Sequence, residues 1–234
     1  MIPIIPDLPV CHVISYAEPV PYPVALAQQY ALAERRQCGE IPDTLLLLEH
    51  PPVITLGRGS HESDLLTDEV ALRVRGIAVE RVDRGGEVSY HAPGQLVGYP
   101  ILDLREHGQD LHRYLRDLEE VIIRALVVYG LHGERVPGRT GVWIEDRKIA
   151  AIGIKVSRWI SLHGWALNIT TDLAPFRQDI IPCGIRDRDV TSLFEVLGDR
   201  CPTRDAVEAV ALHAFAEQFG VQPVFGAELG IITP

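Results

Sequence analysis

The sequence predicts an α/β fold, built as a single domain with a mixed, largely antiparallel sheet flanked by helices. Its 234 residues are 47% hydrophobic, enough to bury a full core within one domain. The predicted strands and helices lack the regular βαβ alternation of a doubly wound parallel sheet. Most consecutive strands are joined by short connections, which favour antiparallel pairing. We therefore expect residues 1–234 to form one domain.

The first elements are a helix and two strands. Residues 23–38 are predicted to be helical, because Pro23 suits a first turn and Gly39 suits the position after a last one. Two short apolar runs, 45–48 and 53–56, are separated by a pair of prolines. Each run has the length and composition of a strand.

A short helix and two further strands follow. Residues 66–75 are predicted to be helical up to Gly76, and residues 77–82 to form a strand that leads into a glycine-rich run. Residues 95–102 are predicted to form the next strand.

The longest helix is predicted at 110–129, where apolar residues recur at helical spacing and Gly130 ends the pattern. Residues 141–144 and 148–157 then read as the two strands of a hairpin, and 161–170 as a further strand.

The C-terminal part of the chain is predicted to be mainly helical. Residues 172–176 are expected to form a short turn or helix. Residues 204–219 have an amphipathic pattern, and Thr203 stands where an N-cap is expected.

The net charge and the N-terminal sequence indicate which binding partners and which cellular location to expect. The formal charge of −10 argues against general nucleic-acid binding, which needs a basic surface. Residues 135–188 carry nine Lys/Arg against five Asp/Glu, so a locally positive site for an acidic partner and chance clustering both remain open. Neither a secretory signal nor a membrane-spanning run is expected, and a cytoplasmic location is predicted.

Residues 84–101 are the most informative stretch of the chain. They hold four glycines, two prolines, an arginine and a histidine. Glycine lets backbone N–H groups approach a ligand closely, and proline restricts the conformation of its neighbours. A β-hairpin rich in turn residues is the plainer interpretation. The length of the run and its charged and titratable side chains favour a binding loop.

Among four cysteines without CxxC spacing, Cys183 is the candidate nucleophile. It lies between Pro182 and Gly184, which favours a presented thiol over a packed one. A free thiol is only a few per cent ionised at neutral pH, so a nucleophilic cysteine needs a cation or a base nearby.

The chain has only two lysines, Lys148 and Lys155, either of which could exchange a proton where arginine cannot. Strand parity puts Lys148 on the apolar face, partly desolvated at its rim. A solvated turn lysine is the plainer alternative. His91 and His163 stand in glycine-bearing segments and are rivals for activating the thiol. None of the nine histidines has HExxH spacing, and no metal site is expected.

These runs resemble a known family. Residues 84–101 are similar to the block RGG-x-x-[ST]-Y-H-x-PGQL-V-x-YP of the octanoyl-[acyl-carrier-protein]:protein N-octanoyltransferases, also called lipoyl(octanoyl) transferases. Ala92 stands where that block has glycine. The resemblance spans about 44–193 and includes residues 46–58, 147–153, 162–168 and 182–185.

The resemblance implies a fold like that of biotin and lipoate protein ligases, and a Cys/Lys dyad made of Cys183 and Lys148. His163 is a possible supporting residue. The matching motifs imply that the acyl and substrate channel is lined by Arg84, Gly85, Gly86, Glu87, Val88, Ser89, Tyr90, His91, Ala151, Ile152, Gly153, Gly164, Trp165 and Ala166. We also expect backbone N–H groups near Gly184 or Gly85 and Gly86 to stabilise an oxyanion.

The implied reaction moves an octanoyl group from octanoyl-acyl carrier protein, through a cysteine thioester, to a lysine of a lipoyl domain. Such acceptors occur in 2-oxoacid dehydrogenase complexes and in the glycine-cleavage H protein. No cofactor, nucleic acid or membrane is implied, because a thioester is already an activated donor. Two alternatives stay open: an ATP-dependent lipoate or biotin protein ligase, and a non-catalytic module that binds acyl carrier protein.

Overall fold

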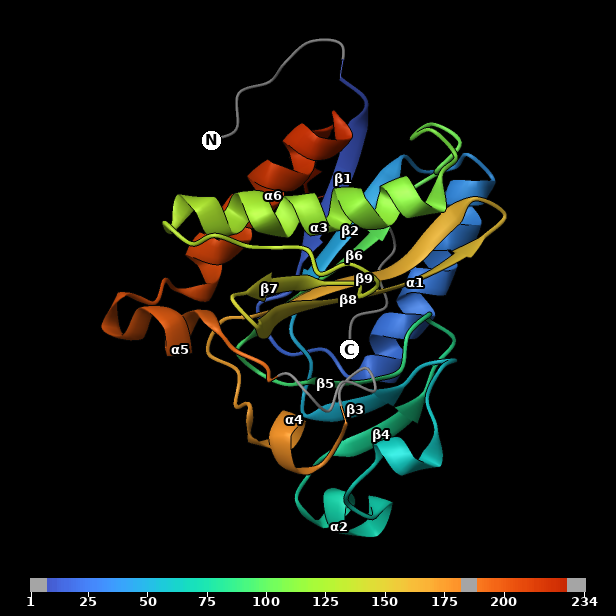
Figure 1. Cartoon of the computed structure of the whole chain (residues 1–234). Coiled ribbons are helices and arrows are strands. Elements are labelled where there is room, and N and C mark those ends of the chain that lie inside the picture. The colour runs from blue at the N-terminus through green and yellow to red at the C-terminus, as the bar shows by residue number, and fades with distance from the viewer. Residues whose placement is uncertain (1–7, 182–188, 227–234) are drawn as a thin grey trace.

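The main sheet has seven strands that run across the middle of the molecule (Figure 1). The computed structural model describes residues 8–181 and 189–226. The order of the strands across the sheet is β10 (Gln222–Phe225), β1 (Val10–Ser15), β2 (Asp43–Leu48), β6 (Gln95–Ile101), β9 (Ile160–Asn168), β8 (Arg147–Ser157) and β7 (Val142–Ile144). The pairings of β1 with β10 and with β2 are parallel, and the other four are antiparallel. The prediction of a mixed, largely antiparallel sheet is therefore confirmed.

Helices cover both faces of this sheet, as Figure 1 shows. On one face α3 (Leu111–Val128) and α6 (Arg204–Phe219) pack on a core that includes Leu45 and Leu47. On the other face α1 (Tyr22–Gln37) packs on a core that includes Leu46 and Leu48. Successive side chains of a strand point to opposite faces, so a strand covered on both sides reads as a continuous apolar run.

A smaller sheet, in the order β4 (Ala78–Arg81), β3 (Val53–Leu56) and β5 (Val88–His91), lies beside the main one. The glycine-rich run therefore forms a loop at 84–87, then β5, then a turn into β6 of the other sheet. The hairpin alternative is wrong, because β5 pairs with β3 and β6 pairs with β2 and β9.

Short helices complete the described part of the chain: the 3₁₀ turn η1 (Glu62–Asp64), α2 (Glu69–Val74), α4 (Ala174–Gln178), α5 (Leu193–Leu197) and η3 (Gly198–Arg200). Thr203 caps α6, as predicted, by accepting a hydrogen bond from the amide of Ala206. The helix expected from residue 66 begins at Glu69, because the Asp68 side chain caps the amides of Val70 and Ala71.

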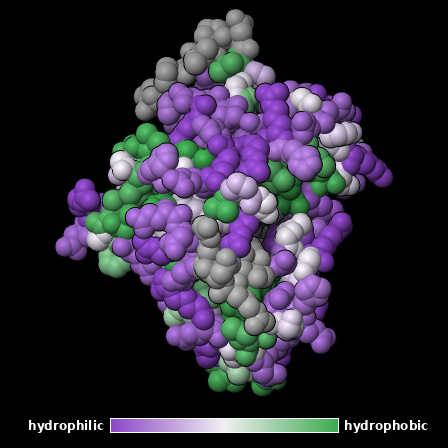
Figure 2. All heavy atoms as spheres, viewed as in Figure 1, coloured by the Kyte–Doolittle hydropathy of each residue, from purple (hydrophilic) through white to green (hydrophobic). Residues whose placement is uncertain are grey.

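The surface in Figure 2 is mostly hydrophilic, as a formal charge of −10 leads one to expect. Apolar colour gathers at the lower tip, over α2, where Val70 and Val74 are exposed. Within residues 8–181 and 189–226, every helix is too short or too polar to cross a membrane.

Candidate active site

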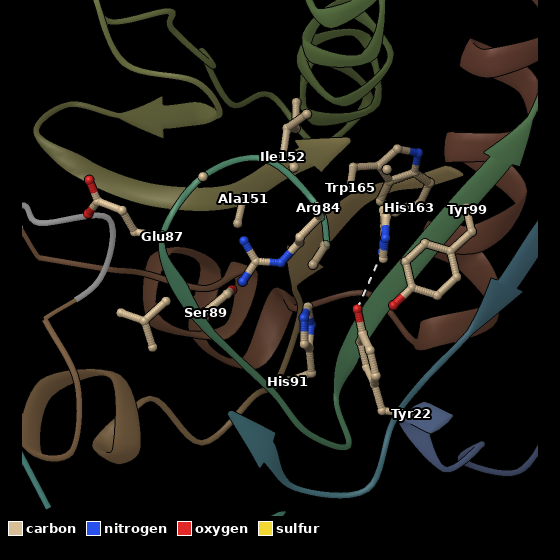
Figure 3. A pocket seen from close by; sticks show the side chains of 15 residues that line it. Tyr22, Arg84, Glu87, Ser89, His91, Tyr99, Ala151, Ile152, His163 and Trp165 are labelled. Carbon is tan, nitrogen blue, oxygen red and sulfur yellow. Dashed lines mark hydrogen bonds between the residues drawn. The ribbon is translucent and has the colours of Figure 1, made fainter. Parts of the chain in front are cut away.

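A cavity lies on the α1 face of the main sheet, between β8, β9 and the 84–87 loop (Figure 3). Its floor is made by two cross-strand pairs, Ala151 with Ala166 and Gly153 with Gly164. Directly paired residues in an antiparallel ladder point to the same face of the sheet. Four small residues therefore leave the space that larger side chains would fill.

The 84–87 loop is held against the edge of β8 and against a turn after β3. The amide of Gly85 donates to the carbonyl of Ile154 at 2.8 Å, and the amide of Gly57 donates to the carbonyl of Glu87 at 3.1 Å. A Cβ at Gly57 would lie 2.4 Å from the Gly86 carbonyl oxygen. Only glycine permits this approach. The Gly85 amide is consequently committed to β8, which corrects its assignment as an oxyanion donor.

Arg84 brings a buried guanidinium to the wall of the cavity. One of its terminal nitrogens donates to the carbonyl and hydroxyl oxygens of Thr55 at 2.9 and 2.8 Å, and the other donates to the Gly85 carbonyl at 3.1 Å. These hydrogen bonds fix the position of the guanidinium. They also supply acceptors for some of its N–H groups, which a buried charged group needs.

His91 is a buried neutral histidine at the cavity. Its Nδ1 lies 2.7 Å from the Gln95 side-chain oxygen, while the Gln95 amide nitrogen donates to Asn168 at 2.8 Å. Gln95 therefore accepts from His91, and Nδ1 carries the proton. Burial is the main reason why the pKa of His91 is well below its ordinary value, and the neighbouring His50 and Arg84 lower it further.

The inner end of the cavity contains residues that the sequence analysis did not identify, Tyr22 and Tyr99. The Tyr22 hydroxyl lies 3.3 Å from Nδ1 of His163, whose Nε2 lies 3.1 Å from the Asp83 carboxylate. Burial lowers the pKa of His163 to about 4, although Asp83 acts in the opposite direction. Burial also raises the pKa of Tyr22 to about 12. Tyr22 and Tyr99 lie 77 positions apart in the chain, so no local motif links them.

Lys148 lies in a second cavity, which adjoins the first and shares Gly86, Glu87, Ile152 and Gly153 with it. Its side chain is 7% exposed, so it is more deeply buried than a residue at the rim. The ammonium nitrogen lies 5.0 Å from the centroid of the Trp143 ring, a cation–π distance. The solvated turn lysine is therefore excluded.

Cys183 lies outside the described residues. The described chain before it ends at Ile181, whose amide donates to the carbonyl of Asp64 at 2.9 Å. It resumes at Asp189, whose carbonyl accepts from the amide of Lys148 at 2.9 Å. The Thr191 amide in turn donates to the Lys148 carbonyl at 2.9 Å, so the backbone of Lys148 pairs with this returning segment.

The structure brings most of the other predicted site residues together. The first cavity is lined by Arg84, Gly86, Glu87, Val88, Ser89, His91, Ala151, Ile152, Gly153, His163, Gly164, Trp165 and Ala166, besides the two tyrosines. Gly85 lines the second cavity. Tyr90 lines neither: its ring packs against Phe176 in the core of the small sheet, with centroids 5.4 Å apart. Alternation along β5 explains this, because Ser89 and His91 point to the cavity and Tyr90 points away from it.

Comparison with solved structures places the fold. Lipoate-protein ligase A bound with ATP aligns with a TM-score of 0.72 at 17% identity, over 94% of this chain and 90% of the ligase. A bipartite lipoate protein ligase from Thermoplasma acidophilum, described together with its E2 lipoyl domain, aligns with a TM-score of 0.70 at 18% identity, over 94% and 88% of the two chains. The predicted fold is thus confirmed.

Comparison with curated sequences gives much higher identity. An octanoyltransferase from Nostoc sp. is 52% identical over 207 residues, which are 88% of this chain and 90% of the relative. The family model described as the lipoyl protein ligase A/B catalytic domain matches residues 21–216. The chain therefore belongs to the lipoyl protein ligase A/B catalytic-domain family.

Proposed function

We propose that this chain is an octanoyltransferase of protein lipoylation. It takes the octanoyl group from the thioester of an acyl carrier protein and passes it, through a thioester on Cys183, to a lysine side chain of a lipoyl domain. The observation that carries the proposal is the buried Lys148. It lines the second cavity, which adjoins the one floored by small residues, and its backbone is hydrogen-bonded to the segment that follows Cys183. Identity above one half to a named octanoyltransferase supports it independently.

In the first step the Cys183 thiolate attacks the carbonyl carbon of the donor thioester. The C–S bond to the carrier breaks, and the leaving carrier thiolate takes a proton from the Lys148 ammonium. A nearby ammonium favours the thiolate over the thiol, and Lys148 is the lysine proposed for this role. The tetrahedral intermediate needs hydrogen-bond donors for its oxygen. With the Gly85 amide committed to β8, Gly86 and Gly184 are the remaining backbone candidates.

In the second step the amine of the acceptor lysine attacks the thioester on Cys183. A C–N bond forms, the C–S bond breaks, and the proton lost by the amine returns the thiolate–ammonium pair to its starting state. Lys148 cannot be a charged partner and a neutral base at the same time. Lys148 is therefore charged beside the thiolate before the first step and neutral before it takes the proton in the second.

Intact-mass measurement tests the first step. Incubation with octanoyl-acyl carrier protein should add one octanoyl group to the wild-type chain and none to Cys183→Ser. Cys38→Ser, which removes an exposed thiol, is the matched control and should acylate normally. An adduct that persists in Cys183→Ser would contradict the proposed nucleophile.

The ATP-dependent ligase is the second candidate, because a lipoate-protein ligase bound with ATP has a similar fold. The two activities differ in their donors. The transferase should modify a lipoyl domain from octanoyl-acyl carrier protein without nucleotide, whereas a ligase should use free octanoate or lipoate and require ATP. Modification that strictly needs ATP would replace the present proposal.

A further inference from the structure

The two ends of the first cavity differ in chemistry. At one end Gly86, Glu87, Ile152 and Gly153 also border the cavity of Lys148. At the other end lie Tyr22, Tyr99 and His163, which border only the first cavity. Figure 3 shows Glu87 on one side and these three residues together on the other. An acyl group bound with its carbonyl near Lys148 would therefore direct its methyl end to the tyrosines.

The dimensions of the sheet set the length of the inner part of this path. The cavity runs from Gly153 on β8, across Gly164 on β9, to Tyr99 on β6. Adjacent strands are about 4.8 Å apart, so two spacings cover about 9.6 Å. The seven C–C bonds of an extended octanoyl chain advance about 9 Å, given a C–C bond of about 1.5 Å. This inner span alone is therefore about the length of an extended octanoyl chain.

The inner end is closed by polar groups that bond to one another. His50 donates from Nδ1 to the Val20 carbonyl at 2.6 Å, so its Nε2 accepts from the Tyr99 hydroxyl at 2.7 Å. His163 donates from Nε2 to Asp83, so its Nδ1 accepts from the Tyr22 hydroxyl. Both hydroxyl protons are thus committed to buried histidines.

Ring packing reinforces this arrangement. The centroids of Tyr22 and His50 lie 5.0 Å apart, and those of Tyr99 and His163 lie 6.3 Å apart. All four side chains are buried, at no more than 4% exposure. An alkyl chain that entered this group would break hydrogen bonds that it cannot replace.

We propose that Tyr22, His50, Tyr99 and His163 form a polar stop that limits the length of the acyl chain the cavity accepts. The inference rests on the proposed function for the identity of the ligand. A longer chain must displace Tyr22 or leave its last carbons outside the cavity. Tyr22 is the residue to change, because it comes from α1 and its removal leaves the strands of the floor intact.

The test compares hexanoyl, octanoyl, decanoyl and dodecanoyl carrier proteins as donors, by the rate at which each acylates the chain. Wild type should prefer octanoyl. Tyr22→Ala should raise the ratio of decanoyl to octanoyl rates by about sixteenfold, since decanoyl has two more methylenes and each newly buried methylene is worth roughly fourfold. Tyr22→Leu, a milder change, should shift the ratio in the same direction. Tyr129→Ala, at the far end of α3, is the matched control and should leave it unchanged.

A second measurement tests chain-length selection by the polar stop separately from acyl transfer. The rise in melting temperature caused by free octanoate, decanoate or dodecanoate reports binding without acyl transfer. Octanoate should stabilise wild type the most, and decanoate should stabilise Tyr22→Ala the most. If the wild-type chain binds octanoate but takes no acyl group, the proposed function fails and the stop survives. If both Tyr22 variants keep the wild-type order of chain lengths in both measurements, the stop is wrong.

Discussion

At the scale of single residues, the central feature is a lysine buried beside the acyl cavity. Lys148 is 7% exposed, and its strand neighbour Trp143 carries the ring beneath its ammonium. Arginine could reproduce the charge but could not exchange a proton. The residue type therefore agrees with a role that needs both forms of the amine.

Replacing Lys148 tests this role. Lys148→Ala should lower the rate of acylation by octanoyl-acyl carrier protein by about two orders of magnitude, the usual contribution of a positioned proton-transfer group. Stopped-flow release of the carrier thiol measures this rate. Arg124→Ala removes an exposed charge that pairs with Glu120 and should acylate at the wild-type rate. Equal rates for the two variants would exclude Lys148.

Three buried histidines should make stability depend on pH. Burial lowers the pKa of His50 and His163 to about 4 and that of His91 well below its ordinary value. The unfolded chain, with histidine pKa values near 6.5, then binds more protons than the folded chain between about pH 6.5 and 4. Stability should therefore fall as pH falls through this window.

Urea unfolding between pH 7 and 4.5 measures the effect. Each buried neutral histidine should cost at most about 1.4 kcal/mol per pH unit. His50→Gln should reduce the slope, whereas His112→Gln, at an exposed position on α3, should not. A wild-type stability that stays flat from pH 7 to 4.5 would contradict neutral buried histidines.

At the scale of elements, α3 positions the segment that lies against Lys148. The buried carboxylate of Glu119 accepts from the Gly141 amide at 3.1 Å and also pairs with Arg116 and Arg135. Gly141 has φ +125°, and a Cβ there would lie 2.5 Å from Cε of Lys148. The absence of a side chain at Gly141 therefore makes room for the lysine.

Gly141→Ala should consequently affect both stability and chemistry. A positive φ should cost the variant on the order of 1 kcal/mol of unfolding free energy, and the added methyl should displace the lysine and slow acylation. Gly130→Ala is the control, because it also has a positive φ (+72°) but no neighbour within 4 Å of a Cβ. It should lose similar stability and keep its activity. Full activity in Gly141→Ala would show that this contact does not position Lys148.

At the scale of the whole molecule, local patterns predicted the helices and central strands well. The 3.6-residue period located α3 and α6, and α6 has the predicted bounds, 204–219. The strands β1, β5 and β10 and the helix α5 were not predicted. Each has four to six residues, and the strands depend on distant partners, as when β1 pairs with β10 more than 200 positions away. Short elements held by nonlocal pairing leave little periodic signal.

Some residues of the candidate site were predictable from the sequence, and others were not. The glycine-rich run pointed to Arg84, because close backbone approach leaves a local trace in a sequence. Strand parity and the family resemblance pointed to Lys148, for which a solvated turn lysine was the plainer local interpretation. Tyr22 and Tyr99 left none, since an aromatic residue at a helix start or in a strand is ordinary. Their meeting depends on α1 crossing the sheet at β6 and β9. The inner wall of the cavity therefore forms only when α1 packs on the sheet, and the local sequence does not predict it.

The pKa of Cys183 tests the proposed thiolate–ammonium pair most directly. The pH dependence of iodoacetamide alkylation, followed by peptide mass, gives it in the intact enzyme, with exposed Cys38 as an internal reference. We expect a Cys183 pKa below the ordinary value of about 8.5 and a rise of about one unit in Lys148→Ala. A Cys183 that titrates like Cys38, and does so equally in both proteins, would contradict the thiolate–ammonium pair.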